Sequence, residues 1–270
     1  MSARDEFIVH IDGEDAGARE LAPLAFAGYA HFTAMQVRGG RLRGLDLHLR
    51  RLRGASMQLF GQALPDEAVR ASLRRALASG PQDVSLTATV YSPAGEFTAA
   101  GADAALRVLV RTAAPASGPR GPLKLAVVEH ERVLPALKHV GEVAKTYYLR
   151  EAVKQGCDDA AFVDRHGRLS EGTIWNLAFW DGEAVVWPKA EMLEGTMMLT
   201  VRRQLQRIGV PQREREVRLG DLASLAGAVV MNSWTPGVAV ERIGDVAMPA
   251  ASAFLALLRR AHQAEPPVAP

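Results

Sequence analysis

Apolar residues divide the first hundred positions into short strands and two helices. Apolar runs followed by turn residues predict strands at 7–11 and 31–37. Positions 46–60 and 66–78 carry apolar residues at helical spacing among charged ones. The pattern then returns to strand periodicity, with two further strands expected at 84–91 and 106–111. This part of the chain is therefore expected to form a small sheet with helices.

The second half also interleaves strands and helices. Gly209 and Pro211 mark the end of one of its helices, because glycine ends helices and proline cannot continue them. The expected strands lie at 123–128, 160–163, 174–179, 184–187 and 228–231, and the expected helices at 140–155, 196–208 and 250–262. Because both halves alternate the two kinds of element, the pattern predicts an α/β or α+β fold.

A segment without periodicity separates the two halves. Positions 113–122 are small and rich in proline and glycine, which is typical of a linker. We therefore expect an N-terminal α/β domain at 1–113, a linker at 114–122 and a C-terminal domain at 123–265. The proline-rich stretch 266–270 is expected to be disordered.

Composition limits the possible partners. Of the 270 residues, 48% are hydrophobic and 23% charged, as expected for a packed globular protein. The net charge is +2 and no long basic run occurs, so neither nucleic acid nor an anionic membrane is an expected partner. The first six residues lack the apolar core of a secretory signal, and no apolar run approaches the roughly 20 residues that span a bilayer. A cytoplasmic location is expected.

Several common site motifs are absent. The sequence contains no P-loop, no G-x-G-x-x-G after a strand, no G-x-S-x-G and no H-E-x-x-H. Cys157 is the only cysteine, which excludes an intrachain disulfide and a cysteine-based zinc site. The seven histidines are scattered, and no two of them have the i, i+4 spacing of a helical metal site. No metal is therefore expected.

Two segments in the second half resemble a known signature. Lys138 lies in Leu137–His139, just before a predicted helix, and Glu171 lies in Leu169–Leu177, which enters a strand. Together they resemble the central signature of class IV aminotransferases, a family that includes branched-chain and D-amino-acid aminotransferases and aminodeoxychorismate lyase. In that family a lysine is followed about thirty residues later by a Thr/Ser-Glu-Gly turn, and here the separation is 171 − 138 = 33.

The resemblance extends over positions 20–262. Leu47–Leu52 is similar to the family's H-x-x-R-L helix, Leu193–Thr196 to its L-x-G turn, and Asn232–Pro236 falls where the family has a second phosphate-contacting loop. The resemblance implies a two-domain enzyme of fold type IV. It further implies a smaller N-terminal domain, a larger C-terminal domain, the cofactor in the cleft between them, and a homodimer.

The implied cofactor is pyridoxal 5'-phosphate. Lys138 would form a Schiff base with the cofactor's aldehyde and carry the proton between substrate and cofactor. Glu171 would keep the pyridine nitrogen protonated, because a carboxylate stabilises the nearby cation. Arg51 would bind the phosphate through a bidentate contact. The remaining cofactor contacts are assigned to a helix start and to a turn: Thr196, Met197, Ser233 and Trp234.

Other assignments stay open at this point. Arg50 or Arg53 could take the place of Arg51, and Glu171 could cap a turn. Lys145 is the alternative Schiff-base lysine, seven residues after Lys138. We favour Lys138 because Lys145 falls inside the expected helix, where we expect it to be partly exposed with its stem laid over its neighbours.

The substrate side departs from the family pattern. Gly141 stands where the family often has asparagine, and Val143 where its branched-chain group has tyrosine. Met198 replaces an arginine after the phosphate turn, and Phe32–Ala34 lacks the family's acidic residue. The cofactor assignment is therefore stronger than any substrate assignment.

Three functions remain on the sequence alone. The favoured reaction is amino transfer between an amino acid and a 2-oxo acid. The alternative is the lyase reaction that converts aminodeoxychorismate to 4-aminobenzoate and pyruvate. The sequence Leu137–His139 favours this alternative. A non-catalytic binding protein on the same fold is the third. The side chain of the amino acid, and its D or L configuration, do not follow from the sequence.

Overall fold

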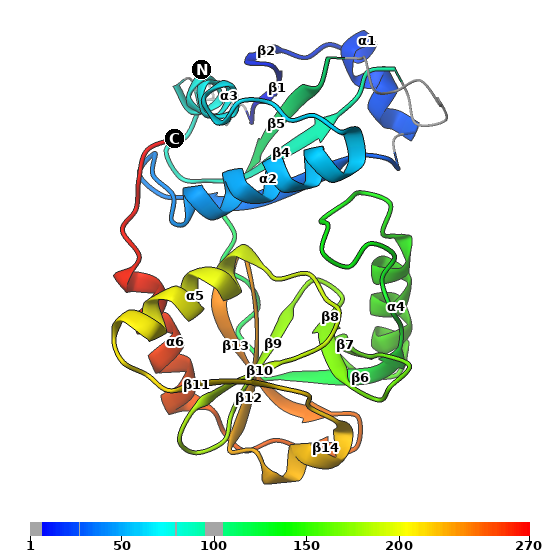
Figure 1. Cartoon of the computed structure of the whole chain (residues 1–270), viewed down its shortest axis with the longest axis vertical. Helices are drawn as coiled ribbons and strands as arrows, with labels where there is room; N and C mark the ends of the chain where they lie inside the picture. Colours follow the sequence, from blue (N-terminus) through cyan, green and yellow to red (C-terminus); the bar gives the residue numbers. More distant parts are fainter. Residues whose placement is uncertain (1–6, 27, 79, 95–104) are drawn as a thin grey trace, which may run out of the picture. The chain divides into compact units, whose positions relative to one another are not determined.

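The computed structural model describes residues 7–26, 28–78, 80–94 and 105–270 (Figure 1). The first six residues of the expected N-terminal domain lie outside the described residues. The chain divides into two compact units. The N-terminal unit holds the chain up to Ala116, with Leu137–Gly141 and Pro267–Pro270 added; the C-terminal unit holds Ser117–Ala136 and Glu142–Pro266. The expected N-terminal domain, 1–113, contains neither added segment, and Leu137–Gly141 falls within the expected C-terminal domain, 123–265.

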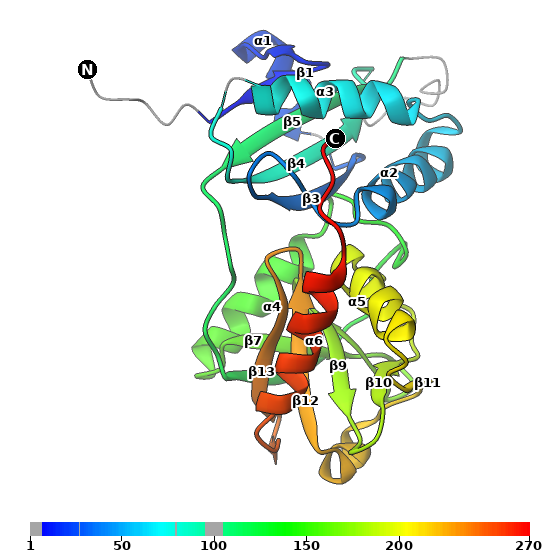
Figure 2. The ribbon, with the colours of Figure 1, turned by 90° about the vertical axis from the view of Figure 1, so that its left-hand side faces the viewer.

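An antiparallel sheet forms the centre of the N-terminal unit. Its strand order is β2-β1-β5-β4-β3, which leaves β3 at an edge. The strands are β1 (Val9–Ile11), β2 (Glu14–Asp15), β3 (His31–Val37), β4 (Val84–Tyr91) and β5 (Arg107–Ala113). The helices are α1 (Ala18–Leu21), α2 (Leu45–Phe60) and α3 (Asp66–Ala78), with a short 3-10 helix at Ala22–Phe26. Figure 2 shows α2 and α3 on the same face of this sheet.

Buried side chains alternate with less buried ones along the strands, and the buried ones form the core beneath these helices. Every second residue of β3 is buried, and Met35 packs in one cluster with Leu86 of β4, Leu49 of α2 and Leu73 of α3. Burying each such side chain contributes about 1.5–3 kcal/mol. The predicted bounds of β3, α3 and β4 are confirmed, because each of these elements has one apolar face that must be covered.

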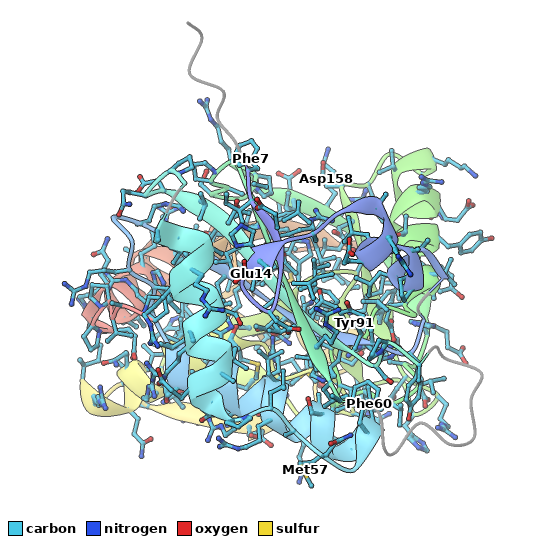
Figure 3. The ribbon with its side chains drawn as sticks, turned by 90° about the horizontal axis from the view of Figure 1, so that it is seen from above. Phe7, Glu14, Met57, Phe60, Tyr91 and Asp158 are labelled. Atoms are coloured by element: carbon cyan, nitrogen blue, oxygen red, sulfur yellow. The ribbon has the colours of Figure 1, made fainter. Side chains whose placement is uncertain are left out.

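The end of α2 shows how its two faces differ (Figure 3). Met57 is 52% exposed and projects at the rim of the view, whereas Phe60 is buried. The Phe60 ring meets the Tyr29 ring edge to face, with centroids 5.6 Å apart. Gly61 ends the helix with φ at 68°, a left-handed conformation that glycine adopts at little cost.

The strands of the C-terminal unit form a closed ring. Strand β8 pairs with both β7 and β9, so the order β9-β12-β13-β6-β7-β8 returns to β9. Strands β10 and β11 extend the sheet beyond β9, and β14 pairs with β13. The ring strands are β6 (Leu123–Glu129), β7 (Asp159–Val163), β8 (Leu169–Gly172), β9 (Asn176–Trp180), β12 (Gly227–Asn232) and β13 (Thr235–Ile243). The others are β10 (Val185–Pro188), β11 (Gln212–Arg215) and β14 (Val246–Ala247).

Helices pack against the outside of this barrel-like sheet. Helices α5 (Thr196–Arg207) and α6 (Ser252–Ala264) contact each other and β12 or β13, and α4 (Val143–Lys154) contacts β6 and β7. Trp187, Met198 and Phe254 belong to the apolar layer between the sheet and helices α5 and α6. A separate apolar cluster is formed by side chains from the other face of the sheet. A short 3-10 helix spans Leu219–Ser224. In the described ranges, no helix combines the length and apolar character needed to cross a membrane.

The proline-rich end is ordered, so the expected disorder is wrong. The backbones of Val268 and Leu42 exchange two hydrogen bonds, of 2.8 and 2.9 Å. The Arg41 guanidinium also donates to the Pro267 carbonyl, at 3.2 Å. Prolines lack an N–H group but keep their carbonyl, and a single valine among them supplies the one donor that this pairing needs. Composition alone does not reveal a partner so far away in sequence.

Candidate functional site

Glu171 lies in the wall of the barrel. It is the third residue of β8, and its Cα is paired with that of Asn176 in β9. The Glu171 side chain is only 4% exposed, although nothing in the local sequence predicts burial of an acid. A buried carboxylate needs hydrogen-bond donors or cations around it, because burial without them is costly. The structure provides both.

Four charged side chains form a buried cluster in the C-terminal unit: Arg132, Glu142, Lys145 and Glu171. Lys145 Nζ lies 3.3 Å from Glu171 Oε2, and an Arg132 terminal nitrogen lies 3.6 Å from Glu171 Oε1. Arg132 Nε lies 3.2 Å from Glu142 Oε1. Burial lowers the pKa of Lys145, while the Glu171 carboxylate opposes this shift. We call these four residues the charge cluster.

The position of Lys145 corrects one expectation. Helix α4 begins at Val143 rather than at Val140, so Lys145 lies in its first turn and not in its middle. Its side chain is 13% exposed and contacts Glu171, whereas we expected a partly exposed lysine laid over its neighbours. The helix starts late because Leu137–Gly141, just before it, belongs to the N-terminal unit and pairs with β3 of that unit.

Lys138 belongs to the N-terminal unit. Phe32 N donates to the Lys138 carbonyl at 2.8 Å, and Val140 N donates to the Ala30 carbonyl at 2.9 Å. The segment around Lys138 is thus paired with β3, the edge strand. Lys138 Nζ lies 4.8 Å from the centroid of the Phe32 ring, a cation–π contact.

Arg51 differs from its neighbours on α2. Arg50 and Arg53 are exposed, and Arg53 pairs with Asp66 at 2.6 Å. Arg51 is half-buried, and its charge acts on His48, which lies one turn earlier. Arg51 therefore has an environment that the other two arginines lack.

Two buried histidines of the N-terminal unit, His31 and His48, predict loss of stability in acid. His31 Nε2 lies 2.8 Å from Ser56 Oγ, and His48 Nδ1 lies 2.6 Å from Thr33 Oγ1. Burial lowers the pKa of His31 from 6.5 to about 4, and burial together with Arg51 lowers that of His48 to about 3. Both stay neutral in the folded protein, while the unfolded chain takes up protons below pH 6.5.

Stability from these histidines is therefore complete above pH 6.5 and falls as the pH drops towards 4. Each histidine costs up to about 1.4 kcal/mol per pH unit in that window. Thermal unfolding of the wild type and of His48→Asn between pH 7 and 4.5 measures this, and the variant should show the shallower decline. Equal slopes would show that protonation of His48 in the unfolded chain does not drive the decline.

Asp159 holds the loop that follows Glu171. Its carboxylate accepts hydrogen bonds from Thr173 Oγ1 at 2.6 Å and from Trp175 Nε1 at 2.8 Å. Asp159 lies in β7, next to β8, so these contacts tie the loop to a neighbouring strand. Sequence reasoning assigned no role to Asp159; the available signal was an acid among the apolar residues of a strand.

Asn176 joins Glu171 to the start of α5. Asn176 Nδ2 donates to the Leu193 carbonyl at 2.6 Å, and Gly195 N donates to Asn176 Oδ1 at 2.9 Å. Leu193 N also approaches Glu171 Oε1, at 3.4 Å. A Cβ on Gly195 would lie 2.0 Å from Asn176 Oδ1, so a larger residue before Thr196 would displace the Asn176 side chain. The site assignments from sequence did not include Asn176.

The turn with Ser233 and Trp234 lies at the same end of the barrel. Met231 is paired with Asn176, which is paired with Glu171, so the three residues form a row across β12, β9 and β8. The turn follows Met231 after one residue. The Trp234 ring lies with its centroid 6.0 Å from that of Trp175.

This arrangement suits a ligand with an anionic group and a basic nitrogen. The first N–H groups of α5, at Thr196 and Met197, have no partner within the helix and attract anions. Glu171 is a buried carboxylate that can hold a protonated nitrogen. Across the described part of the chain, no group of three or more His, Cys, Asp or Glu side chains is arranged to hold a metal ion.

Comparison with a family profile decides the family. The profile described as amino-transferase class IV matches residues 30–243. The chain belongs to the class IV aminotransferase family. The matched range includes all seven residues that the sequence assigned to the cofactor.

Solved structures share the fold of this class IV aminotransferase family member. A branched-chain aminotransferase from Thermoproteus uzoniensis with norvaline is 17% identical, with a TM-score of 0.81 over 96% of this chain and 94% of that one. The 4-amino-4-deoxychorismate lyase from Pseudomonas aeruginosa is 23% identical, with a TM-score of 0.80 over 95% and 99%. An aminotransferase from Brucella abortus, bound to the cofactor PLP, is 18% identical, with a TM-score of 0.81 over 95% and 98%.

These likenesses confirm the predicted fold class. The chain has the mixed α/β fold of these enzymes, with a smaller N-terminal sheet and a larger, barrel-like C-terminal sheet. No curated protein matches the sequence significantly. At these identities the structures establish the fold and leave the reaction to be argued from the site.

Proposed function

We propose that this chain is a pyridoxal 5'-phosphate enzyme that moves an amino group between an amino acid and a 2-oxo acid. One observation carries the proposal. The Asn176 side chain forms hydrogen bonds with the turn that opens α5, and the Asn176 backbone is paired with Glu171. The same residue therefore connects a buried carboxylate with an anion-binding helix start. Such a pair matches the two ends of the cofactor, its ring nitrogen and its phosphate.

Each chain residue then has a defined task. When bound, pyridoxal phosphate supplies an aldehyde and a ring that withdraws electrons from the substrate. Glu171 holds a proton on the ring nitrogen, and the N–H groups of Thr196 and Met197 bind the phosphate. Arg51 and the hydroxyl of Ser233 add to the phosphate contacts. Trp234, in the same turn as Ser233, completes the proposed cofactor contacts.

Geometry supports Lys138 over Lys145 as the Schiff-base lysine. The aldehyde carbon and the nitrogen lie at opposite ends of the pyridine ring. A lysine that takes the aldehyde must therefore stand a ring's length from the carboxylate that holds the nitrogen. Lys145 Nζ lies 3.3 Å from Glu171 Oε2, where the ring nitrogen would lie, and not a ring's length away. Lys138 keeps the family spacing to Glu171, and its amine carries the proton to and from the substrate.

Arg51→Ala is expected to weaken binding of pyridoxal phosphate far more than Arg50→Ala or Arg53→Ala. Loss of a bidentate, charge-assisted contact should reduce affinity on the order of 30- to 150-fold. Titration of the apoprotein with the cofactor measures the effect, and the two exposed arginines are matched controls on the same helix. Equal losses at all three positions would mean that a diffuse positive field attracts the phosphate.

Absorbance measurements test the proposed function. The purified protein is mixed with pyridoxal phosphate, and its visible absorbance is followed on addition of a panel of L- and D-amino acids. The expected result is a cofactor band that one class of amino acid removes and a 2-oxo acid restores. A protein that stays colourless after addition of the cofactor would favour the non-catalytic binding protein.

The lyase reaction is the second candidate. The sequence Leu137–His139 favours this reaction, and a 4-amino-4-deoxychorismate lyase is among the structures that share the fold. Lys138 would serve the same tethering and proton-carrying roles in both reactions. Release of pyruvate from aminodeoxychorismate, without any 2-oxo acid acceptor, would identify the lyase.

A homodimer is part of the proposal. Large apolar side chains are exposed in the segment before α4 and on α4 itself, among them Val133, Val143 and Tyr147, at 77%, 82% and 57%. Clustered apolar groups on a surface are typical of an interface. Sedimentation of the purified protein is expected to give twice the mass of one chain.

A further inference from the structure

Each acid of the charge cluster has a cationic partner before any ligand is added. It pairs two cationic side chains, Arg132 and Lys145, with two anionic ones, Glu142 and Glu171. Arg132 and Glu171 are 3% and 4% exposed, and the other two are 13% exposed. The formal charges of these four residues sum to zero. Such buried ions are stable only while each has an oppositely charged partner, because an uncompensated buried charge strongly destabilises the fold.

A protonated nitrogen at Glu171 would upset this balance. It would bring a further cation to Glu171, which already contacts Lys145 and Arg132, in a region where water screens little. The added charge is offset if one of the cluster's own cations gives up a proton. An arginine guanidinium stays protonated in proteins, whereas a lysine amine shifts its pKa readily when buried. Lys145 is thus the group in the cluster that can lose the charge.

We propose that Lys145 is a positioning residue for Glu171 that releases its proton to solvent when a protonated ring nitrogen takes its place at the carboxylate. The inference rests on the function proposed above. In the protein without cofactor, Lys145 and Arg132 hold Glu171 in place. With the cofactor bound, the neutral Lys145 amine no longer competes for Glu171, and the ring nitrogen keeps its proton.

The surroundings of Lys145 favour this exchange. Desolvation is the largest influence on its pKa and lowers it, and the positive charge of Arg132 acts in the same direction. Glu171 and Glu142 oppose both, with Glu171 the stronger. The nearby His130 also has a lowered pKa through burial. A cation that neutralises Glu171 therefore removes the main influence that keeps Lys145 charged.

Proton counting tests the proposal without any measurement of turnover. Binding of pyridoxal phosphate to the apoprotein is followed by titration calorimetry in buffers of different ionisation enthalpy, which gives the protons released. We expect the wild type to release about one proton more than Lys145→Met, because only the wild type has this proton to lose. Protons from the phosphate and from imine formation are common to both and cancel in the difference.

A matched control lies on the same helix. Lys154 is 71% exposed at the end of α4 and pairs with Glu151, so its environment is independent of Glu171. Lys154→Met is expected to release as many protons as the wild type. The difference at Lys145 then reports on the charge cluster and not on the loss of any lysine from α4.

The order of affinities separates this role from a structural one. Lys145→Arg keeps the ion pair with Glu171 but cannot shed its charge, so cofactor affinity should fall on the order of tenfold or more. Lys145→Met should bind at least as tightly as the wild type. If Lys145 only supported the fold, the conservative arginine would be the milder change and the order would reverse.

Each outcome has one meaning. Equal proton release by the wild type and Lys145→Met overturns the proposal, since Lys145 then keeps its proton. If Lys145→Met does not fold, Lys145→Arg decides, because it too should release about one proton fewer. Absence of cofactor binding in the wild type itself would contradict the proposed function instead.

Discussion

Borohydride reduction of the protein loaded with pyridoxal phosphate is expected to fix the pyridoxyl group on Lys138. Lys138→Met should lower amino transfer on the order of a thousandfold or more, because one amine serves as both tether and proton carrier. Peptide mapping of the reduced protein identifies the labelled lysine, and single-turnover absorbance measures the loss.

Lys145 provides the contrast for this experiment. Its amine touches Glu171, so Lys145→Met should still yield a label on Lys138. A pyridoxyl group found on Lys145 in the wild type would overturn the assignment. It would also leave no free Lys145 amine beside Glu171, and would so contradict the proton-release proposal.

Glu171→Gln is expected to keep the cofactor bound but to lose most amino transfer. A neutral amide does not hold the ring nitrogen protonated, and withdrawal of electrons by the ring is the main contribution to the rate. The loss should be about two powers of ten or more. Cofactor occupancy from absorbance and turnover from product formation, measured on the same sample, separate the two effects.

Glu151→Gln is the control for removal of a carboxylate. Glu151 pairs with Lys154 on α4 and has no contact with the charge cluster, so its loss should change neither occupancy nor turnover. Near-normal turnover of Glu171→Gln with a fully occupied cofactor would show that another group protonates the ring, or that ring protonation does not limit the rate.

Elements with a covered apolar face could be predicted from the sequence, and others could not. Strand β4 has its expected bounds because each second residue packs under α2 and α3. Strand β13 escaped prediction because Pro236 and Gly237, which usually interrupt strands, stand near its start. Strand β8 has only four residues, two of them polar, and exists because β7 and β9 pair with its two edges.

The candidate site divides in a similar way. Glu171 stood out through its short motif, which is local in sequence. Arg132, Lys145 and Asn176 acquire their contacts with the Glu171 region only when the barrel closes. Lys145 shows the limit most clearly, since an error of three residues in the predicted start of α4 turned a buried ion pair into an expected surface lysine.

The pairing of Val268 with Leu42 joins some of the last residues to be synthesised to the unit that is synthesised first. The N-terminal unit includes Pro267–Pro270, which are made only after the whole C-terminal unit. A fragment that stops at Ala116 leaves Leu42 without its backbone partner, and β3 without the segment around Lys138. The unit that is translated first is therefore the one that is completed last.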